Sequence, residues 1–222
     1  MTLSINMAAQ ANPQLESQGM ASTAHPLATA AAETIFKLGG NSVDAAIAAS
    51  LTLAVVEPSM SGLGGRAQAI VKLADGSLRG YNGMTEIPAG FVLQKEMPSS
   101  GYTTVATPGL IALLQVLHKN HGSLPFEDLI QPALQHASKG FALLAGEASR
   151  HQSSAKKIRQ DFGMSMAYLN NRKKAFDAGE ELKQPGLART LARLSRFGPD
   201  DFYRGEIARE ISDDVLKNGG FI

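Results

Sequence analysis

The first candidate for a functional site is a group of glycines with the spacing of a phosphate-binding loop. Residues 62–67 read Gly-Leu-Gly-Gly-Arg-Ala and fit the pattern G-x-G-x-x-A. In a dinucleotide site this loop follows a strand and opens a helix, whose N-terminus meets the pyrophosphate. Here a helical pattern precedes the glycines, and strand-like alternation over residues 67–73 follows them. The order predicts a tight turn from a helix into a strand, and it argues against a nucleotide site.

Nucleophiles and metal ligands are sparse in the sequence. It has no cysteine and no G-x-S-x-G segment, which excludes thiol chemistry, a thiolate zinc site and a serine-hydrolase elbow. The internal pair Thr103-Thr104 lacks the free amine that activates a threonine nucleophile, and we expect it in a strand-like stretch. His118 and His121 have no carboxylate close in sequence, and we expect them at a solvated helix end. We therefore expect no catalytic residue, no metal site and no cofactor in this chain.

Basic residues concentrate between residues 150 and 174, although the whole chain has a net charge of only +1. A solvated helical face or a surface that meets an acidic partner segment is favoured over nucleic-acid binding, because no aromatic residues interleave with the charges. No apolar run approaches the roughly 20 residues of a membrane span. Residues 1–15 also lack the pattern of a signal peptide. The sequence as it stands is therefore expected in the cytoplasm, while its composition leaves cytoplasm and periplasm both open.

Apolar spacing and turn residues predict the elements that position these groups. Residues 1–18 are polar and are expected to form a flexible tail. One predicted helix opens at Pro26 and ends at Gly39-Gly40; the next is capped by Asn41 or Ser42 and stops before Pro58. The second is rich in alanine, so we expect it to pack against a sheet. A β-hairpin then turns at Asp75-Gly76, and helices are predicted near residues 108–121, 125–140, 187–194 and 207–215.

The predicted fold class is α+β, with one hairpin among many helices. An enclosed sheet needs more strands than one hairpin supplies. We therefore expect the chain to be a fragment of a longer protein, or one subunit of a processed protein.

Eight segments, in the same order along the chain, closely resemble the γ-glutamyltransferase (γ-glutamyltranspeptidase, glutathione hydrolase) family. The most specific of them is the run Gly-Gly-Asn-x-Val-Asp-Ala-Ala. The segments are Gly19-Met20-Ala21-Ser22 with His25-Pro26-Leu27-Ala28, Leu38-Gly39-Gly40-Asn41-Ser42-Val43-Asp44-Ala45-Ala46, Val55-Val56-Glu57-Pro58, Ser61-Gly62-Leu63-Gly64-Gly65, Pro108-Gly109, Gly122-Ser123-Leu124-Pro125-Phe126, Leu187-Ala188-Arg189-Thr190-Leu191 and Phe202-Tyr203-Arg204-Gly205-Glu206-Ile207-Ala208.

The resemblance implies part of an N-terminal nucleophile hydrolase, an αββα sandwich in which the small-subunit strands are missing here. The family is made as a precursor that cleaves itself into a large and a small subunit. The new N-terminal threonine of the small subunit attacks a γ-glutamyl amide, and water or an amino acid resolves the acyl-enzyme. Residues 19–222 match the earlier, incomplete part of the large subunit. The expected partners are the C-terminal small subunit and a small γ-glutamyl or acyl-amide substrate, and the chain alone should not catalyse.

One family residue of the large subunit is replaced in this sequence. The family uses an arginine in an Arg-Glu-Thr-Ala-Pro-like segment to grip the substrate α-carboxylate, and Met84 occupies its position. A thioether cannot make that bidentate, charge-assisted contact. Arg66 is a candidate substitute. A two-residue hairpin loop would put Arg66 opposite Thr85 and on the wrong face. A three-residue loop would put it opposite Glu86 and on the face of Met84, where it would either replace the family arginine or form an ion pair with Glu86.

Two alternatives follow from the replacement of the arginine by Met84. The first is an acylase of the same superfamily that acts on a side-chain amide such as that of a cephalosporin, because a methionine favours a less charged acyl group. The second is a degenerate, non-catalytic relative that serves as a binding or structural subunit, which Met84 and the missing nucleophile both favour.

Overall fold

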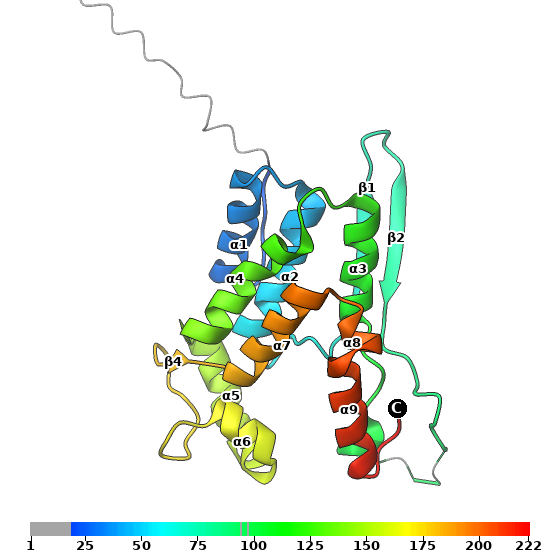
Figure 1. Cartoon of the computed structure of the whole chain (residues 1–222). Helices are drawn as coiled ribbons and strands as arrows, with labels where there is room; N and C mark the ends of the chain where they lie inside the picture. The colour runs from blue at the N-terminus through cyan, green and yellow to red at the C-terminus, as the bar shows by residue number, and fades with distance from the viewer. Residues whose placement is uncertain (1–18, 94, 97) are drawn as a thin grey trace, which may run out of the picture.

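The protein is described by a computed structural model that covers residues 19–93, 95–96 and 98–222 and is built mainly from helices (Figure 1). The predicted tail, residues 1–18, lies outside the described residues. The hairpin stands beside α3 on one side of the molecule in Figure 1, and α1, α2, α4 and α7 gather on the other. The helices are α1 (Pro26–Lys37), α2 (Ser42–Val56), α3 (Leu110–His121), α4 (Phe126–Lys139), α5 (Ala145–Gln160), α6 (Phe162–Tyr168), α7 (Pro185–Phe197), α8 (Asp201–Arg204) and α9 (Glu206–Lys217).

The ends of the first two helices form as the sequence predicts. Pro26 opens α1, and the Nδ1 atom of His25 accepts a hydrogen bond from the backbone N–H of Leu27 at 3.1 Å. Gly39 follows α1 with a φ of +86°, a conformation that glycine adopts without strain. The side chain of Asn41 caps the N-terminus of α2. The carboxylate of Asp44 in turn accepts a hydrogen bond from the backbone N–H of Asn41, which completes a capping box.

Within the described residues α2 packs against helices and not against the sheet that its alanine-rich sequence predicts. The principal neighbours of α2 are the helices α1 and α4, with α3 next. The side chains of Ile47, Leu51 and Val55 are completely buried, and the alanines between them let helices approach α2 on several sides. An alanine-rich helix predicts close packing, but it does not specify whether the neighbour is a sheet or a helix.

The hairpin consists of β1 (Ala67–Lys72) and β2 (Leu78–Gly83), which pair antiparallel. Ala67 pairs with Gly83, and Lys72 pairs with Leu78. The N–H of Leu73 then donates to the carbonyl oxygen of Ser77 at 2.9 Å, so the loop is residues 74–76. Gly76 has a φ of +84°, which fits the left-handed third position of a three-residue loop.

Both predicted hairpin registers are therefore wrong. Paired residue numbers add to 150, as in Ala67 and Gly83, rather than to 151 or 152. The Asp75-Gly76 dipeptide lies at the second and third loop positions, because glycine takes the left-handed position at the end of the loop. The shift changes which residue faces Arg66.

The remaining strands are short. β3 (Phe141–Ala142) pairs with β4 (Glu181–Leu182), between the helical segments. Thr103 and Thr104 lie in the 3₁₀-helix η2 (Tyr102–Thr104), so their predicted strand-like conformation is wrong. The predicted α+β class, rich in helices, is confirmed.

Candidate functional site

Arg66 and Met84 lie at the two strand ends where the hairpin meets the rest of the chain. They are the next residues beyond the pair Ala67 and Gly83, and continuing the same register puts them opposite each other. A Cβ on Gly83 would lie 2.5 Å from the Cβ of Leu113, so this pair faces α3. Because neighbours in a strand alternate faces, Arg66 and Met84 share the opposite, exposed face. The register thus brings together the positions of the two residues that are candidates for a substrate site from the sequence.

The glycine-rich turn, residues 61–65, leads directly into Arg66. The carbonyl oxygen of Gly65 accepts hydrogen bonds from the backbone N–H groups of Gly109 and Leu110, both at 3.1 Å. These bonds fix the end of the turn to the N-terminus of α3. The expectation of a helix-to-strand turn is confirmed, because α2 precedes the glycines and β1 follows them.

The glycine-rich turn borders two hollows. A cavity of about 560 Å³ has Arg66 in its wall, and a cleft of about 840 Å³ extends toward α6, α7 and α9. Ser61 and Gly62 line both hollows, whereas Met84 lines neither. The cavity beside Arg66 is lined by Ser50, Leu53, Pro58, Met60, Ser61, Gly62, Gly65, Arg66, Ala67 and Leu110. An otherwise largely uncharged wall with one cation suits a ligand that carries a carboxylate.

Sequence analysis missed a buried polar cluster just before the turn. Glu147, near the start of α5, is 2% exposed. Its carboxylate accepts hydrogen bonds from the backbone N–H of Ser59 at 2.8 Å and from the Ser59 hydroxyl at 2.6 Å. Arg150 and His151 also contact it, at 2.7 Å and 3.1 Å. No local pattern could reveal this cluster, because Ser59 and Glu147 are 88 residues apart; Arg150 looked like part of a solvated basic face.

The Glu147 cluster predicts a loss of stability in acid. Burial alone would raise the pKa of Glu147, but hydrogen bonds from His151, Ser59 and Arg150 outweigh it and lower the pKa from 4.5 to about 2. Between these values the unfolded chain binds more protons than the folded chain. The stabilisation is thus complete above pH 4.5 and is lost as the pH falls toward 2. Thermal midpoints measured from pH 7 to 2.5 should fall more steeply in the wild type than in Glu147→Gln, and parallel curves would contradict this.

The two histidines at the end of α3 do not form a solvated terminus, and that expectation is wrong. Nε2 of His121 lies 2.5 Å from the hydroxyl oxygen of Tyr81 on β2. Nε2 of His118 donates to the carbonyl oxygen of Leu124 at 2.8 Å. Both side chains are half-buried, and they hold the loop after α3 and the hairpin in place.

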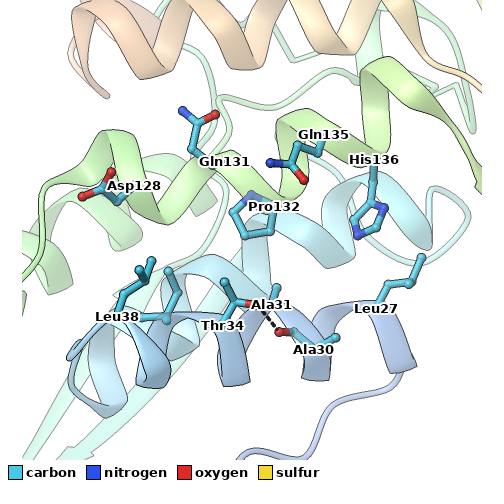
Figure 2. A pocket seen from close by; sticks show the side chains of 11 residues that line it. Leu27, Ala30, Ala31, Thr34, Leu38, Asp128, Gln131, Pro132, Gln135 and His136 are labelled. Carbon is cyan, nitrogen blue, oxygen red and sulfur yellow. Dashed lines mark hydrogen bonds between the residues drawn. The ribbon is translucent and has the colours of Figure 1, made fainter.

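A separate hollow of about 300 Å³ lies between α1 and α4 (Figure 2). The Thr34 hydroxyl, which lines it, donates to the carbonyl oxygen of Ala30 within α1 at 2.8 Å. Neither Arg66 nor Met84 lines this hollow. Its walls are Leu27, Ala30, Ala31, Thr34, Ile35 and Leu38 from α1 and its end, and Asp128, Gln131, Pro132, Gln135 and His136 from α4.

Two further observations concern the described residues alone. No helix among them is both long and apolar enough to pass through a membrane. No three of their histidine, aspartate and glutamate side chains are grouped so as to hold a metal ion.

Comparison with models of known protein families shows the family to which this chain belongs. The model of a family described as Gamma-glutamyltranspeptidase matches residues 28–222. The chain belongs to this family. The fold expected from the resemblance, part of the family's N-terminal nucleophile hydrolase architecture, is thereby confirmed.

Proteins similar to this chain include both hydrolases and acylases. The chain is 33% identical to a glutathione hydrolase proenzyme of Pseudomonas sp. (strain A14) over 228 residues, which cover 98% of this chain and 40% of that protein. The crystal structure of Helicobacter pylori gamma-glutamyltranspeptidase matches with a TM-score of 0.87 and 28% identity, covering 92% of this chain and 62% of that chain. The crystal structure of a cephalosporin acylase from Bacillus halodurans matches with a TM-score of 0.82 and 30% identity, covering 89% of this chain and 39% of that chain. The chain therefore spans 40% of the length of the curated relative, and membership of the family does not select a substrate.

The family-specific Gly-Gly-Asn-x-Val-Asp run has a structural role in this chain. Asp44, completely buried, accepts hydrogen bonds from the backbone N–H of Asn41 at 3.0 Å and of Ser123 at 3.0 Å, and from the Ser123 hydroxyl at 2.5 Å. The amide of Asn41 donates to the carbonyl oxygen of His121 at 2.7 Å. The motif thus joins the start of α2 to the loop between α3 and α4, away from the cavity that Arg66 lines.

Proposed function

We propose that this chain is the large-subunit portion of a γ-glutamyltransferase-like amidohydrolase or acyltransferase. The nucleophile is a threonine at the N-terminus of a small subunit from the same precursor, on a segment outside residues 1–222. Membership of the family supports this proposal, as do relatives whose printed names describe them as proenzymes. The substrate is a small γ-glutamyl or related acyl amide.

The proposed reaction divides its tasks between the two subunits. The free amine of the threonine takes the proton of its own hydroxyl, and the oxygen attacks the amide carbonyl carbon. The C–N bond then breaks, the leaving amine receives the proton, and an acyl ester remains. Water or an amino acid amine attacks this ester and regenerates the threonine. The present chain contributes the wall of the acyl pocket and a cation that holds the acyl group in place.

Arg66 is the proposed cation. The hairpin register carries this assignment, because it aligns Arg66 with Met84, the position of the family arginine. Arg66 lies on the strand next to Met84. From there its guanidinium can offer two parallel N–H donors to the substrate carboxylate. Arg66 also lines the cavity of about 560 Å³, which gives such a carboxylate a place to bind.

A cephalosporin-acylase-like activity is the second candidate. Met84 favours a less charged acyl group, and the B. halodurans cephalosporin acylase matches this chain nearly as well in structure as the H. pylori enzyme. A degenerate subunit that only binds ligand or partner is the remaining alternative, since Met84 removes the family arginine.

The coding sequence beyond Ile222 and one pair of substrates test these candidates. We expect an in-frame Thr-Thr-His-like segment, and a product of the complete gene that cleaves γ-glutamyl-p-nitroanilide in preference to phenylacetyl-p-nitroanilide. A preference for the phenylacetyl compound, which has no carboxylate, would favour the acylase. A stop codon after Ile222, or no cleavage of either compound, would support the degenerate subunit and contradict the proposal.

A further inference from the structure

Ser59 is held by a carboxylate from a distant part of the chain. It lies between the end of α2 and the glycine-rich turn. Oε1 of Glu147 accepts from its backbone N–H, and Oε2 accepts from its hydroxyl. The Nε–H of Arg150 donates to the same hydroxyl oxygen at 2.6 Å. Two bonds from one carboxylate to one residue fix both the position and the orientation of the backbone at Ser59.

Glu147 is itself held rigidly. Nη2 of Arg150 donates to Oε2 at 2.7 Å, and Nε2 of His151 lies 3.1 Å from Oε1. The carboxylate is 2% exposed, and a buried anion is stable only when hydrogen-bond donors surround it. Such a group restrains whatever it contacts, because moving Ser59 away would leave the charge without two of its partners.

The turn between Ser59 and Arg66 has an anchor at each end, and between them the side chain of Leu63 is 6% exposed and packs in the hydrophobic core. The second anchor is the carbonyl oxygen of Gly65, bound by α3 as described above. An added Cβ at Gly62 or Gly64 would meet nothing within 4 Å, so these residues are not wedged against the described chain. The path of the turn therefore depends on the bonds at its two ends and on the burial of Leu63, and the contacts of Ser59 act most directly on residues 59–62.

We propose that Glu147 is a positioning residue for the site: through Ser59 it holds the glycine-rich turn, and thereby Arg66, in place beside the cavity. This inference rests on the proposed function for the role of Arg66 in binding substrate. Glu147 contacts no substrate and takes no part in the chemistry. Its effect is on the preorganisation of the turn, which lowers the cost of binding.

The first test is hydrogen exchange of the chain without any substrate. In Glu147→Gln, an amide N–H replaces one acceptor and meets the donors of Ser59 or its neighbours. We expect amides of residues 59–66 to exchange at least about tenfold faster than in the wild type, with those of β1, β2 and α3 little changed. The matched control is Glu181→Gln, which removes an exposed ion pair with Lys183. Unchanged exchange over residues 59–66, or equal acceleration along the whole chain, would overturn the proposal.

A second, milder variant covers the case in which Glu147→Gln does not fold. Ser59→Ala removes the hydroxyl bonds but keeps the backbone N–H bond to Glu147. It should give the same local acceleration to a smaller degree. Combining it with Glu147→Gln should add less than the sum of the two effects, because both act on one contact. Full additivity would contradict the coupling.

The kinetic test uses the protein encoded by the complete gene. Glu147→Gln should raise KM for γ-glutamyl-p-nitroanilide about tenfold and change kcat less than about threefold, as expected for a lost binding contact. In an Arg66→Ala background it should raise KM no further. The same increase in that background would show that Glu147 does not act through Arg66. If Arg66→Ala alone changes nothing, the proposed role of Arg66 fails, while the exchange experiment still tests the anchor.

Discussion

Replacing Arg66 with alanine should weaken the binding of a γ-glutamyl ligand to the complete protein by about 30-fold. Loss of a bidentate, charge-assisted contact to a carboxylate costs about 2 kcal/mol, which corresponds to this change in affinity. In the proposed site Met84 cannot replace the contact, since its thioether has no donor. Isothermal titration calorimetry with glutamate, the product of γ-glutamyl hydrolysis, measures the effect directly.

Two further variants distinguish a specific contact from a general change in charge. Arg79→Ala removes another exposed arginine from the same hairpin and should leave the affinity unchanged. Adding Met84→Arg to Arg66→Ala should restore most of the binding, because the register makes the two positions neighbours on one face. Unaltered affinity in Arg66→Ala would remove Arg66 from the site.

Replacing Asp44 with alanine should lower the free energy of unfolding by about 3 kcal/mol, because a buried carboxylate with several donors is lost. The Asn41 and Ser123 backbone N–H groups would lose their acceptor, as would the Ser123 hydroxyl. The start of α2 and the loop between α3 and α4 would then separate more easily. Urea unfolding of the purified chain, followed by circular dichroism, gives the change in free energy.

The control for Asp44 is Asp213→Ala, on the exposed surface of α9. It should leave the urea midpoint close to that of the wild type, since surface substitutions rarely matter much. An Asp44→Ala variant that is as stable as this control would contradict the structural role assigned to the family motif.

Local chemistry was enough to predict the first two helices and their ends. Pro26, Asn41 and Gly39 act through bonds and backbone angles within a few residues, so their effects can be inferred from neighbours in the sequence. The hairpin turn was also found from Asp75-Gly76. Its two predicted registers differ from the observed one by one and by two residues, because the dipeptide fits more than one loop and only the left-handed angle at Gly76 decides between them.

The features that the sequence could not predict depend on contacts between distant residues. The helical neighbours of α2 follow from how the whole chain packs, and an alanine-rich face suits either a helix or a sheet. The bond between Ser59 and Glu147 joins segments with no shared local pattern. The site was predicted only in part: Arg66 and Met84 were found through the family resemblance, but their alignment required the observed pairing.

The central claim is that the reactive threonine lies outside residues 1–222, while this chain supplies the scaffold and the substrate cation. The most direct measurement is to treat the product of the complete gene with an electrophilic γ-glutamyl analogue, such as a diazoketone, and to map the modified peptide by mass spectrometry. The account predicts one label, on the N-terminal threonine of a segment that follows residue 222, and none on residues 19–222. A stoichiometric label on a side chain within residues 19–222 would contradict it.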